Sequence, residues 1–150
     1  MSGRYLEDFA IGQVYKSPGR LKVEAEAIKR FAAEFDPQPF HLDEQTAKDT
    51  FFGSLAASGW HTAALTMRLL VESDLSPDWG IIGVGGEVSW PGPLRPGDEI
   101  RIESEILDVR PSKSNPAQGL IKARTTTLNQ KDQPVQILIA NLFIPRRSAA

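Results

Sequence analysis

The most informative segment of this chain is Asp36–Asp43, which reads Asp-Pro-Gln-Pro-Phe-His-Leu-Asp and contains one of the two histidines. Proline fixes its own φ and keeps the residue before it out of helical backbone. We therefore expect a rigid, extended turn from Asp36 to His41. Such a turn could hold the carboxylate and the imidazole toward the same space as an acid–base pair. The alternative is a polar turn between two helices, with Asp43 capping the second.

Two helical segments flank this pair. Apolar residues recur at helical spacing between Val23 and Phe35, so the pattern predicts a helix there that ends at Asp36. A short helix over Glu44–Lys48 should follow, with Asp43 as its N-cap. Both elements are needed to fix the positions of the acid and the histidine.

A second helix is predicted from Trp60 to Val71, after a run of small residues that includes Ser58 and Gly59. Its residues are apolar on almost every face, which is typical of a helix buried inside a fold. Ser58 is a residue type that favours the N-cap position. The free N–H groups at the start of such a helix can bind negative charge.

From residue 81 onward the hydrophobic period changes from helical to two. The alternation is clearest from Ile100 to Ile106, and Val135–Ile144 is apolar almost throughout, as in a central strand. Turns or loops are predicted over Pro91–Asp98, Pro111–Gln118 and Asn129–Gln133. Four or more antiparallel strands after one buried helix indicate an α+β fold, with a curved sheet wrapped around that helix.

Length and charge narrow the class of protein. The 150 residues suit a single domain over residues 1–150, and the net charge of −2 comes without a basic stripe, so nucleic acid is not an expected partner. No apolar run approaches the roughly 18 residues of a membrane helix, and membranes are not expected partners either. Because Met1–Asp8 lacks the apolar core of a signal peptide, we expect a cytoplasmic protein.

Residue types also exclude several kinds of chemistry. The chain has no cysteine, which excludes disulfides, thiol catalysis and cysteine-ligated metals. With two histidines and no His-x-x-x-His motif, a zinc site is not expected. Glycines Gly83, Gly85 and Gly86 do not form a nucleotide-binding G-x-G-x-x-G pattern, and we interpret them as sites of close strand-to-helix packing. No metal or cofactor is therefore predicted.

The order of these elements and three motifs resemble the hot-dog fold, and within it the MaoC-like dehydratase and (R)-specific enoyl-CoA hydratase family. Asp36–Asp43 is similar to the family's D-x-N-P-x-H-x-D signature. Ala57-Ser58-Gly59-Trp60 stands where the central helix should begin. Ser89–Ile100 is similar to a strand–turn–strand segment that ends in Pro-Gly-Asp, a motif of the fold rather than of the chemistry. The resemblance covers about residues 10–145.

The resemblance implies a role for particular residues. The family's catalytic acid corresponds to Asp36 and its histidine to His41. Its oxyanion donor, a backbone N–H at the start of the central helix, falls near Gly59, and Ser58 and Trp60 beside it are further candidates for substrate binding. The implied reaction is the reversible addition of water to a 2-enoyl thioester, carried by CoA or by acyl carrier protein, in a homodimer or a higher multiple of one.

Departures from the family pattern leave other functions open. Gln38 replaces the usual Asn, Ser58 stands where many members carry His, and Ala64 stands where some carry Ser. A hot-dog thioesterase would need an acid on the central helix to activate water, and the helix offers only Glu72 near its far end. A module that binds acyl thioesters without turnover is the remaining alternative.

Several other residues have less specific interpretations. His61 lies on the central helix, where we expect a buried imidazole with its hydrogen bonds satisfied. Trp60 is expected in the core or in the wall of a pocket. The cations Arg95, Lys113, Arg146 and Arg147 are available for a CoA phosphate, although solvated surface positions are the simpler expectation.

Overall fold

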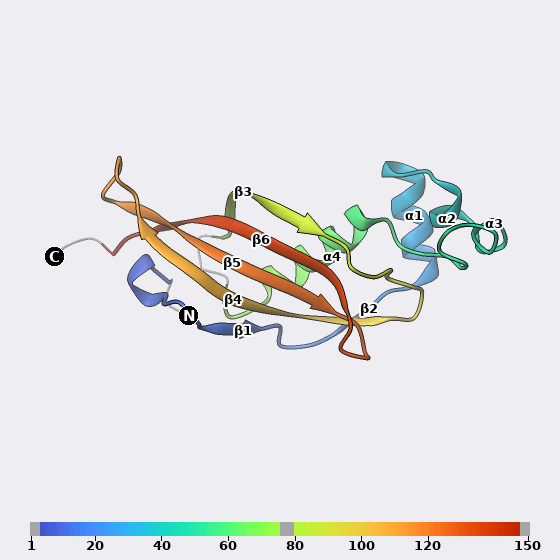
Figure 1. The fold of residues 1–150 in the computed structure, drawn as a ribbon, viewed down its shortest axis with the longest axis horizontal. Helices are drawn as coiled ribbons and strands as arrows, with labels where there is room; N and C mark the ends of the chain where they lie inside the picture. The colour runs from blue at the N-terminus through green and yellow to red at the C-terminus, as the bar shows by residue number, and fades with distance from the viewer. Residues whose placement is uncertain (1–3, 76–79, 148–150) are drawn as a thin grey trace.

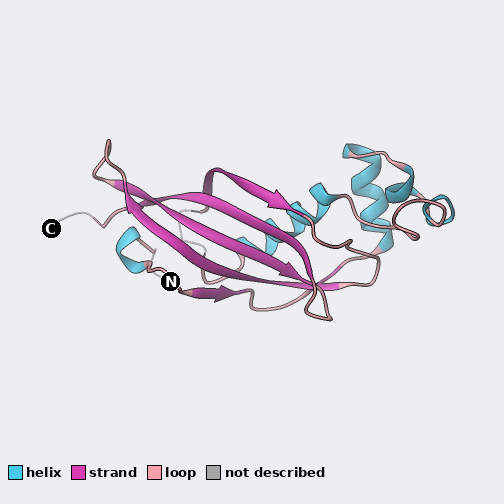
Figure 2. Ribbon diagram, viewed as in Figure 1, coloured by secondary structure: helices cyan, strands magenta, loops and turns pink. Residues whose placement is uncertain are grey.

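The computed structural model describes residues 4–75 and 80–147. Its main layer is a curved antiparallel sheet that packs along one side of the helix α4 (Gly59–Val71), as Figure 1 shows. The shorter helices α1 (Ala25–Phe35), α2 (Pro39–Leu42) and α3 (Glu44–Ala47) gather beyond one end of the sheet (Figure 2). A 3-10 turn, η1 (Leu6–Asp8), lies near the opposite end.

The sheet has the strand order β1-β4-β5-β6-β3 in the described residues, and β2 also pairs with β4. Every pair is antiparallel. The period-two segments found in the sequence became the four long strands, while the two short N-terminal strands were not expected. The strands are β1 (Val14–Lys16), β2 (Leu21–Lys22), β3 (Ile82–Ser89), β4 (Glu99–Pro111), β5 (Gln118–Leu128) and β6 (Pro134–Pro145).

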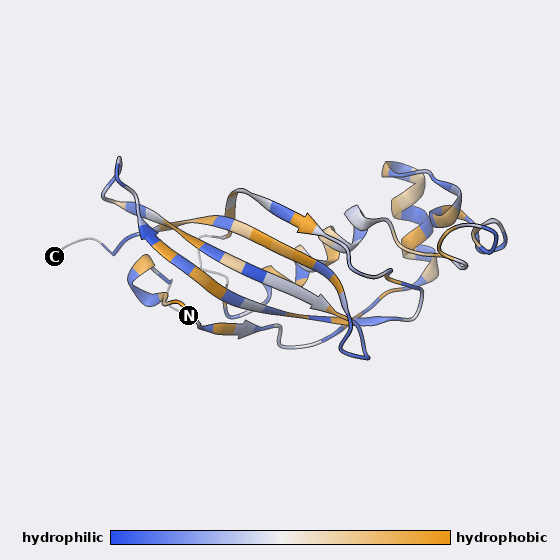
Figure 3. Ribbon diagram, in the orientation of Figure 1, coloured by the Kyte–Doolittle hydropathy of each residue, from blue (hydrophilic) through white to orange (hydrophobic). Residues whose placement is uncertain are grey.

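Buried and partly exposed residues alternate along β4 and β5, and the buried ones show which face of the sheet packs into the core. Ile100, Ile102, Ser104 and Ile106 are buried, and the charged residues that alternate with them are partly exposed. Figure 3 shows the same alternation as bands of hydropathy across the sheet. Opposite Ile106 in the register lies Ala123 of β5, on the same buried face. Burying one face of a sheet fixes its register, because a slip by one residue would turn the apolar face to water.

The segment from Asp36 to His41 is only partly the extended turn that was expected. Pro39 begins the short helix α2, which contains His41 and ends before Asp43. A proline at the first helical position is well tolerated because its missing N–H would have no helical partner there. Asp43 caps α3 as predicted, since its carboxylate accepts the Thr46 N–H at 2.9 Å.

Helix α4 is buried on one side only, which corrects the prediction of all-round burial. Thr62, Thr66 and Leu69 are among its buried residues. The opposite face carries an exposed apolar stripe at helical spacing. The stripe comprises Trp60, Ala64, Met67 and Val71.

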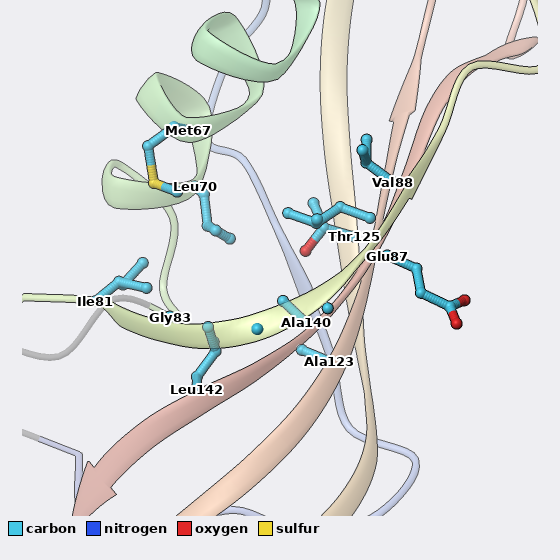
Figure 4. A pocket seen from close by; sticks show the side chains of 13 residues that line it. Met67, Leu70, Ile81, Gly83, Glu87, Val88, Ala123, Thr125, Ala140 and Leu142 are labelled. Atoms are coloured by element: carbon cyan, nitrogen blue, oxygen red, sulfur yellow. The ribbon is translucent and has the colours of Figure 1, made fainter. Parts of the chain in front are cut away.

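The glycines of β3 line a cavity between the sheet and α4, and do not bring the strand against the helix as expected. This apolar cavity has a volume of about 290 Å³. The buried Leu70 of α4 faces the sheet across it, and the partly exposed Met67 also lines it (Figure 4). Gly85 has a φ of 146° at a bulge in the β3–β6 register. A Cβ at Gly86 would lie 2.8 Å from the Cα of Ala140, so this glycine permits close strand–strand contact.

We predict that Gly86→Ala destabilises the protein while Gly83→Ala does not. The added methyl at Gly86 meets backbone atoms of β6, which cannot move aside, and overpacking of this kind costs about 1–3 kcal/mol. A Cβ at Gly83 meets only Leu142 Cδ2, at 4.0 Å. Urea unfolding of both variants provides the comparison, and equal stabilities would contradict the assignment of Gly86 to close packing.

Candidate active site

Three helix ends converge where the sequence placed the acid–base pair. Asp36 is the C-cap of α1, and its N–H donates to the Ala32 carbonyl. His41 lies in α2, and Ser58 is the N-cap of α4, accepting the Trp60 N–H on its hydroxyl at 3.2 Å. Asp36 and Ser58 have the non-helical backbone that a helix end requires, while His41 is held in the last turn of α2.

The carboxylate of Asp36 is the centre of this junction. Its Oδ2 lies 3.4 Å from His41 Nε2 and accepts a hydrogen bond of 2.7 Å from the Ser58 hydroxyl. Its Oδ1 accepts a hydrogen bond of 2.5 Å from the Gln38 side-chain amide. Gln38, which departs from the family pattern, therefore supplies an N–H donor to the acid.

The tautomer of His41 follows from its other contact. Nδ1 lies 2.6 Å from the carbonyl oxygen of Ala56, which can only accept, so Nδ1 carries the hydrogen. In the neutral ring Nε2 is then a lone pair directed toward Asp36. His41 is buried, at 4% exposure, and Phe40 packs edge-on against its ring. The imidazole is therefore fixed in orientation, with a hydrogen on Nδ1.

Opposing effects set the pKa of Asp36. Burial removes water from the carboxylate and would raise its pKa, but the hydrogen bonds from Ser58 and Gln38 and the nearby His41 outweigh it. The net result is a pKa below the ordinary value for Asp. Asp36 is therefore ionised at neutral pH and faces His41 as a hydrogen-bond acceptor.

A pocket of about 450 Å³ opens beside His41. Its walls come from α2, the turn after α3, the start of α4 and the segment after β3. The lining residues are His41, Phe51, Phe52, Ala57, Gly59, Thr62 and Trp90–Leu94. Except for His41 and Gly59, these residues were not identified as site residues from the sequence, because aromatic residues in turns have no distinctive local pattern.

Gly59 is the first residue of α4, and its N–H donates no hydrogen bond to any described residue. The indole of Trp90 packs directly against its Cα. A Cβ at this position would lie 2.7 Å from Trp90 Cε2. A Gly59→Ala substitution must therefore displace the Trp90 indole.

Ser58 and Trp60, the other two candidate residues at the start of α4, have different surroundings. Ser58 is fully buried, and its hydroxyl joins Asp36 to the Trp60 N–H. Trp60 is 60% exposed, so it does not lie in the core, and its ring packs edge-on against Trp90 with centroids 5.3 Å apart. Trp60 is not among the residues that line the pocket.

Two further expectations need correction. His61 is buried and stacks on Phe31, but its Nδ1 has no hydrogen-bond partner among the described residues, so the imidazole is not satisfied. Burial, followed by the charge of Arg30, lowers its pKa. Arg95 is not simply solvated, because its guanidinium donates to the Ser54 hydroxyl and to the Phe52 carbonyl and ties down the turn beside the pocket.

Other kinds of site were searched for in residues 4–75 and 80–147. No group of three or more His, Cys, Asp or Glu side chains in that part of the chain could hold a metal ion. No helix described there is long and apolar enough to cross a membrane.

We predict that Ser58→Ala raises the pKa of Asp36, because one hydrogen bond to the ionised form is lost. It should also destabilise the protein by about 1 kcal/mol through the lost N-cap. Ser58→Gly separates the two effects, since glycine caps almost as well but donates no hydroxyl.

Carbon NMR titration of the Asp36 carboxyl and urea unfolding at neutral pH measure these effects. A depressed pKa adds stability above the unfolded-state pKa, and this stability is lost as pH falls through the folded-state pKa. Both variants should lose less stability than wild type over that acidic range. An unchanged Asp36 pKa in both variants would contradict the assignment.

The family model and the solved structures that match this chain indicate the same family. The model of the MaoC like domain matches residues 8–128. The uncharacterised Bacillus subtilis protein YdeM is 37% identical over 131 residues, which cover 87% of this chain and 91% of YdeM. The 3-hydroxybutyryl-CoA dehydratase of Methylorubrum extorquens is 27% identical over 112 residues, covering 73% of this chain and 68% of that enzyme.

The crystal structure of the MaoC-like dehydratase from Rhodospirillum rubrum superposes with a TM-score of 0.94. It is 54% identical, and the match covers 98% of this chain and 100% of that one. The predicted hot-dog fold is thereby confirmed, with its curved antiparallel sheet against a long helix. This chain belongs to the MaoC-like domain family, which includes hydratases and dehydratases.

Proposed function

We propose that this protein catalyses the reversible addition of water to a 2-enoyl thioester, with Asp36 and His41 as its acid–base pair. The observation that carries the proposal is the arrangement of Asp36 Oδ2 and His41 Nε2, 3.4 Å apart beside the pocket. The similarity to a 3-hydroxybutyryl-CoA dehydratase supports the same reaction class. No cofactor is required for this chemistry.

The pair is suited to hold one water molecule. When His41 is neutral, with its hydrogen on Nδ1, and Asp36 is ionised, both facing atoms are acceptors, so a water beside them can donate to both. A water held in this way can lose its proton to the pair as its oxygen adds to C3. The pair then delivers a proton to C2, which restores its starting state. Because the two groups interact closely, they act as one coupled unit.

Negative charge that develops on the thioester oxygen requires a donor. Gly59 lines the same pocket as His41, and its N–H, which has no partner among the described residues, stands at the positive end of α4. We propose this N–H as the oxyanion donor, and a preorganised donor of this kind contributes about 10²–10³-fold in rate. Neither Ser58, whose hydroxyl is engaged with Asp36, nor the outward-facing Trp60 is proposed to contact the thioester.

The thioesterase alternative has no support in the geometry. Its only candidate acid on α4, Glu72, lies at the C-cap, 13 residues from Gly59, and forms an exposed ion pair with Arg68. At 1.5 Å per residue this places it about 20 Å along the helix from the pocket. A module that binds thioesters without turnover is distinguished by experiment.

We predict that Asp36→Asn and His41→Gln each lower the rate of crotonyl-CoA hydration by about 10²–10⁴-fold. His41 is buried and bonded to Ala56, so alanine would leave a cavity there, whereas glutamine retains a donor. Loss of the enoyl absorbance measures hydration. Variants that keep the wild-type melting temperature and the wild-type rate would refute the assignment.

The same assay separates the alternatives when it is repeated with enoyl-CoA substrates of increasing chain length and with an enoyl acyl carrier protein. Hydration by the wild type supports the proposal, release of free thiol from the carrier indicates a thioesterase, and binding without turnover indicates a module. Lys131→Glu, a change in the exposed turn between β5 and β6, is the matched control and should keep the wild-type rate.

We further propose that the protein is a homodimer or a multiple of one. The apolar stripe of α4 is exposed, and β3 lies at the edge of the described sheet with free backbone groups. Exposed stripes and sheet edges of this kind favour pairing with a second copy.

We predict that Ala64→Glu, a charge in the middle of the stripe, converts the assembly to monomers, whereas Lys113→Glu does not. Light scattering after gel filtration measures the mass against the 16.5 kDa of one chain. A wild-type protein that is monomeric at all concentrations would contradict the proposal.

A further inference from the structure

Gln136 is a fully buried amide near the start of β6. Its carbonyl oxygen accepts the indole N–H of Trp90 at 2.9 Å. Its side-chain nitrogen has no hydrogen-bond partner within the described residues. A buried amide with an unpaired donor destabilises a fold relative to an apolar residue of the same size. Core packing therefore does not explain a glutamine at this position.

The bond to Trp90 provides an explanation. Trp90 follows the end of β3, where the chain turns away from the sheet, and its indole lies over Gly59 and lines the pocket that contains His41. Gln136 is opposite Thr127 in the β5–β6 register, and Thr127 is hydrogen bonded to Thr66 of α4. Gln136 thus stands on the part of the sheet that is hydrogen bonded to α4, and holds an indole that is itself 39% exposed.

We propose that Gln136 is a positioning residue of the active site, which acts by holding the Trp90 indole against the start of α4. The indole lines the same pocket as Gly59 and lies against it, so its orientation sets the shape of the site proposed to receive the thioester. This inference rests on the proposed function. Gln136 itself is not among the residues that line the pocket, so its effect on substrate passes through Trp90.

The test uses Gln136→Met, which removes the acceptor with little change in volume, and Trp90→Phe, which removes the donor from the more exposed side. Asn141→Met is the matched control. Asn141 also lies on β6 and also has a buried, unpartnered side-chain atom, but it alternates with Ala140 and Leu142, which face α4, and so points to the other face of the sheet.

NMR on the full-length protein, labelled with a nitrogen isotope, follows the hydrogen bond from the Trp90 indole to Gln136 directly. The Trp90 indole N–H signal is the one absent from Trp90→Phe. In Gln136→Met we expect this proton to exchange with solvent roughly five- to tenfold faster than in wild type, because its acceptor is gone. Asn141→Met should leave the exchange rate unchanged. The melting temperature of Gln136→Met should be equal to or above that of wild type, which a purely structural role would not produce.

Kinetics with crotonyl-CoA test the consequence. We expect Gln136→Met to lower kcat/KM roughly ten- to a hundredfold, mainly through KM, because the wall of the site is misplaced. The double variant Gln136→Met/Trp90→Phe should have the same kcat/KM as Trp90→Phe alone, since Gln136 acts through Trp90. Additive losses in the double variant, or a wild-type KM in Gln136→Met despite faster indole exchange, would overturn the inference.

Failure of the proposed function is recognised separately. If the wild type shifts the Trp90 indole signal on adding crotonyl-CoA but does not hydrate it, the hydratase proposal fails, and the same variants are compared by the dissociation constant obtained from that shift. Weaker binding in Gln136→Met than in Asn141→Met then supports the positioning role, and equal binding contradicts it.

Discussion

The candidate site depends on one partly buried ionic group, the carboxylate of Asp36, whose side chain is 18% exposed. Removing a charge from water is unfavourable unless hydrogen bonds replace the lost hydration. Here the replacements come from the Gln38 amide and the Ser58 hydroxyl, and the His41 ring lies on the remaining side. The requirement to satisfy this carboxylate therefore ties the end of α1, the short helix α2 and the start of α4 to a single point.

The same requirement links electrostatics to function. Ser58 donates to Asp36 and accepts from the first turn of α4, so the acid and the helix end cannot move independently. An ionised carboxylate near a helix N-terminus is favoured by the helix dipole, as is an anionic oxygen at the Gly59 N–H. The two negative groups use different donors, because Gly59 N–H is not engaged by Asp36.

The sequence predicted those parts of the fold that rest on local patterns. Alternation along β4–β6 and the Asp43 cap follow from side-chain direction and hydrogen bonding within a few residues, and both were found. Helix α2 was missed because a proline is compatible with a turn and with a first helical position. Burial of His41 depends on Ala56, 15 residues further along the chain, and the Trp90–Gln136 bond joins residues 46 apart. No local pattern carries information of this kind.

Gly59 shows how a correct residue choice can rest on an incomplete reason. From the sequence, a glycine at the start of the central helix suggests room for a thioester to approach the backbone. In the structure that room is occupied by the Trp90 indole, so packing alone requires the glycine. The oxyanion proposal therefore depends on the unpartnered N–H and its place beside His41, and not on the missing side chain. The Trp90 indole explains the glycine and also lines the pocket, and it is held by Gln136 of the sheet. The shape of the site therefore depends on the sheet as well as on Asp36 and His41.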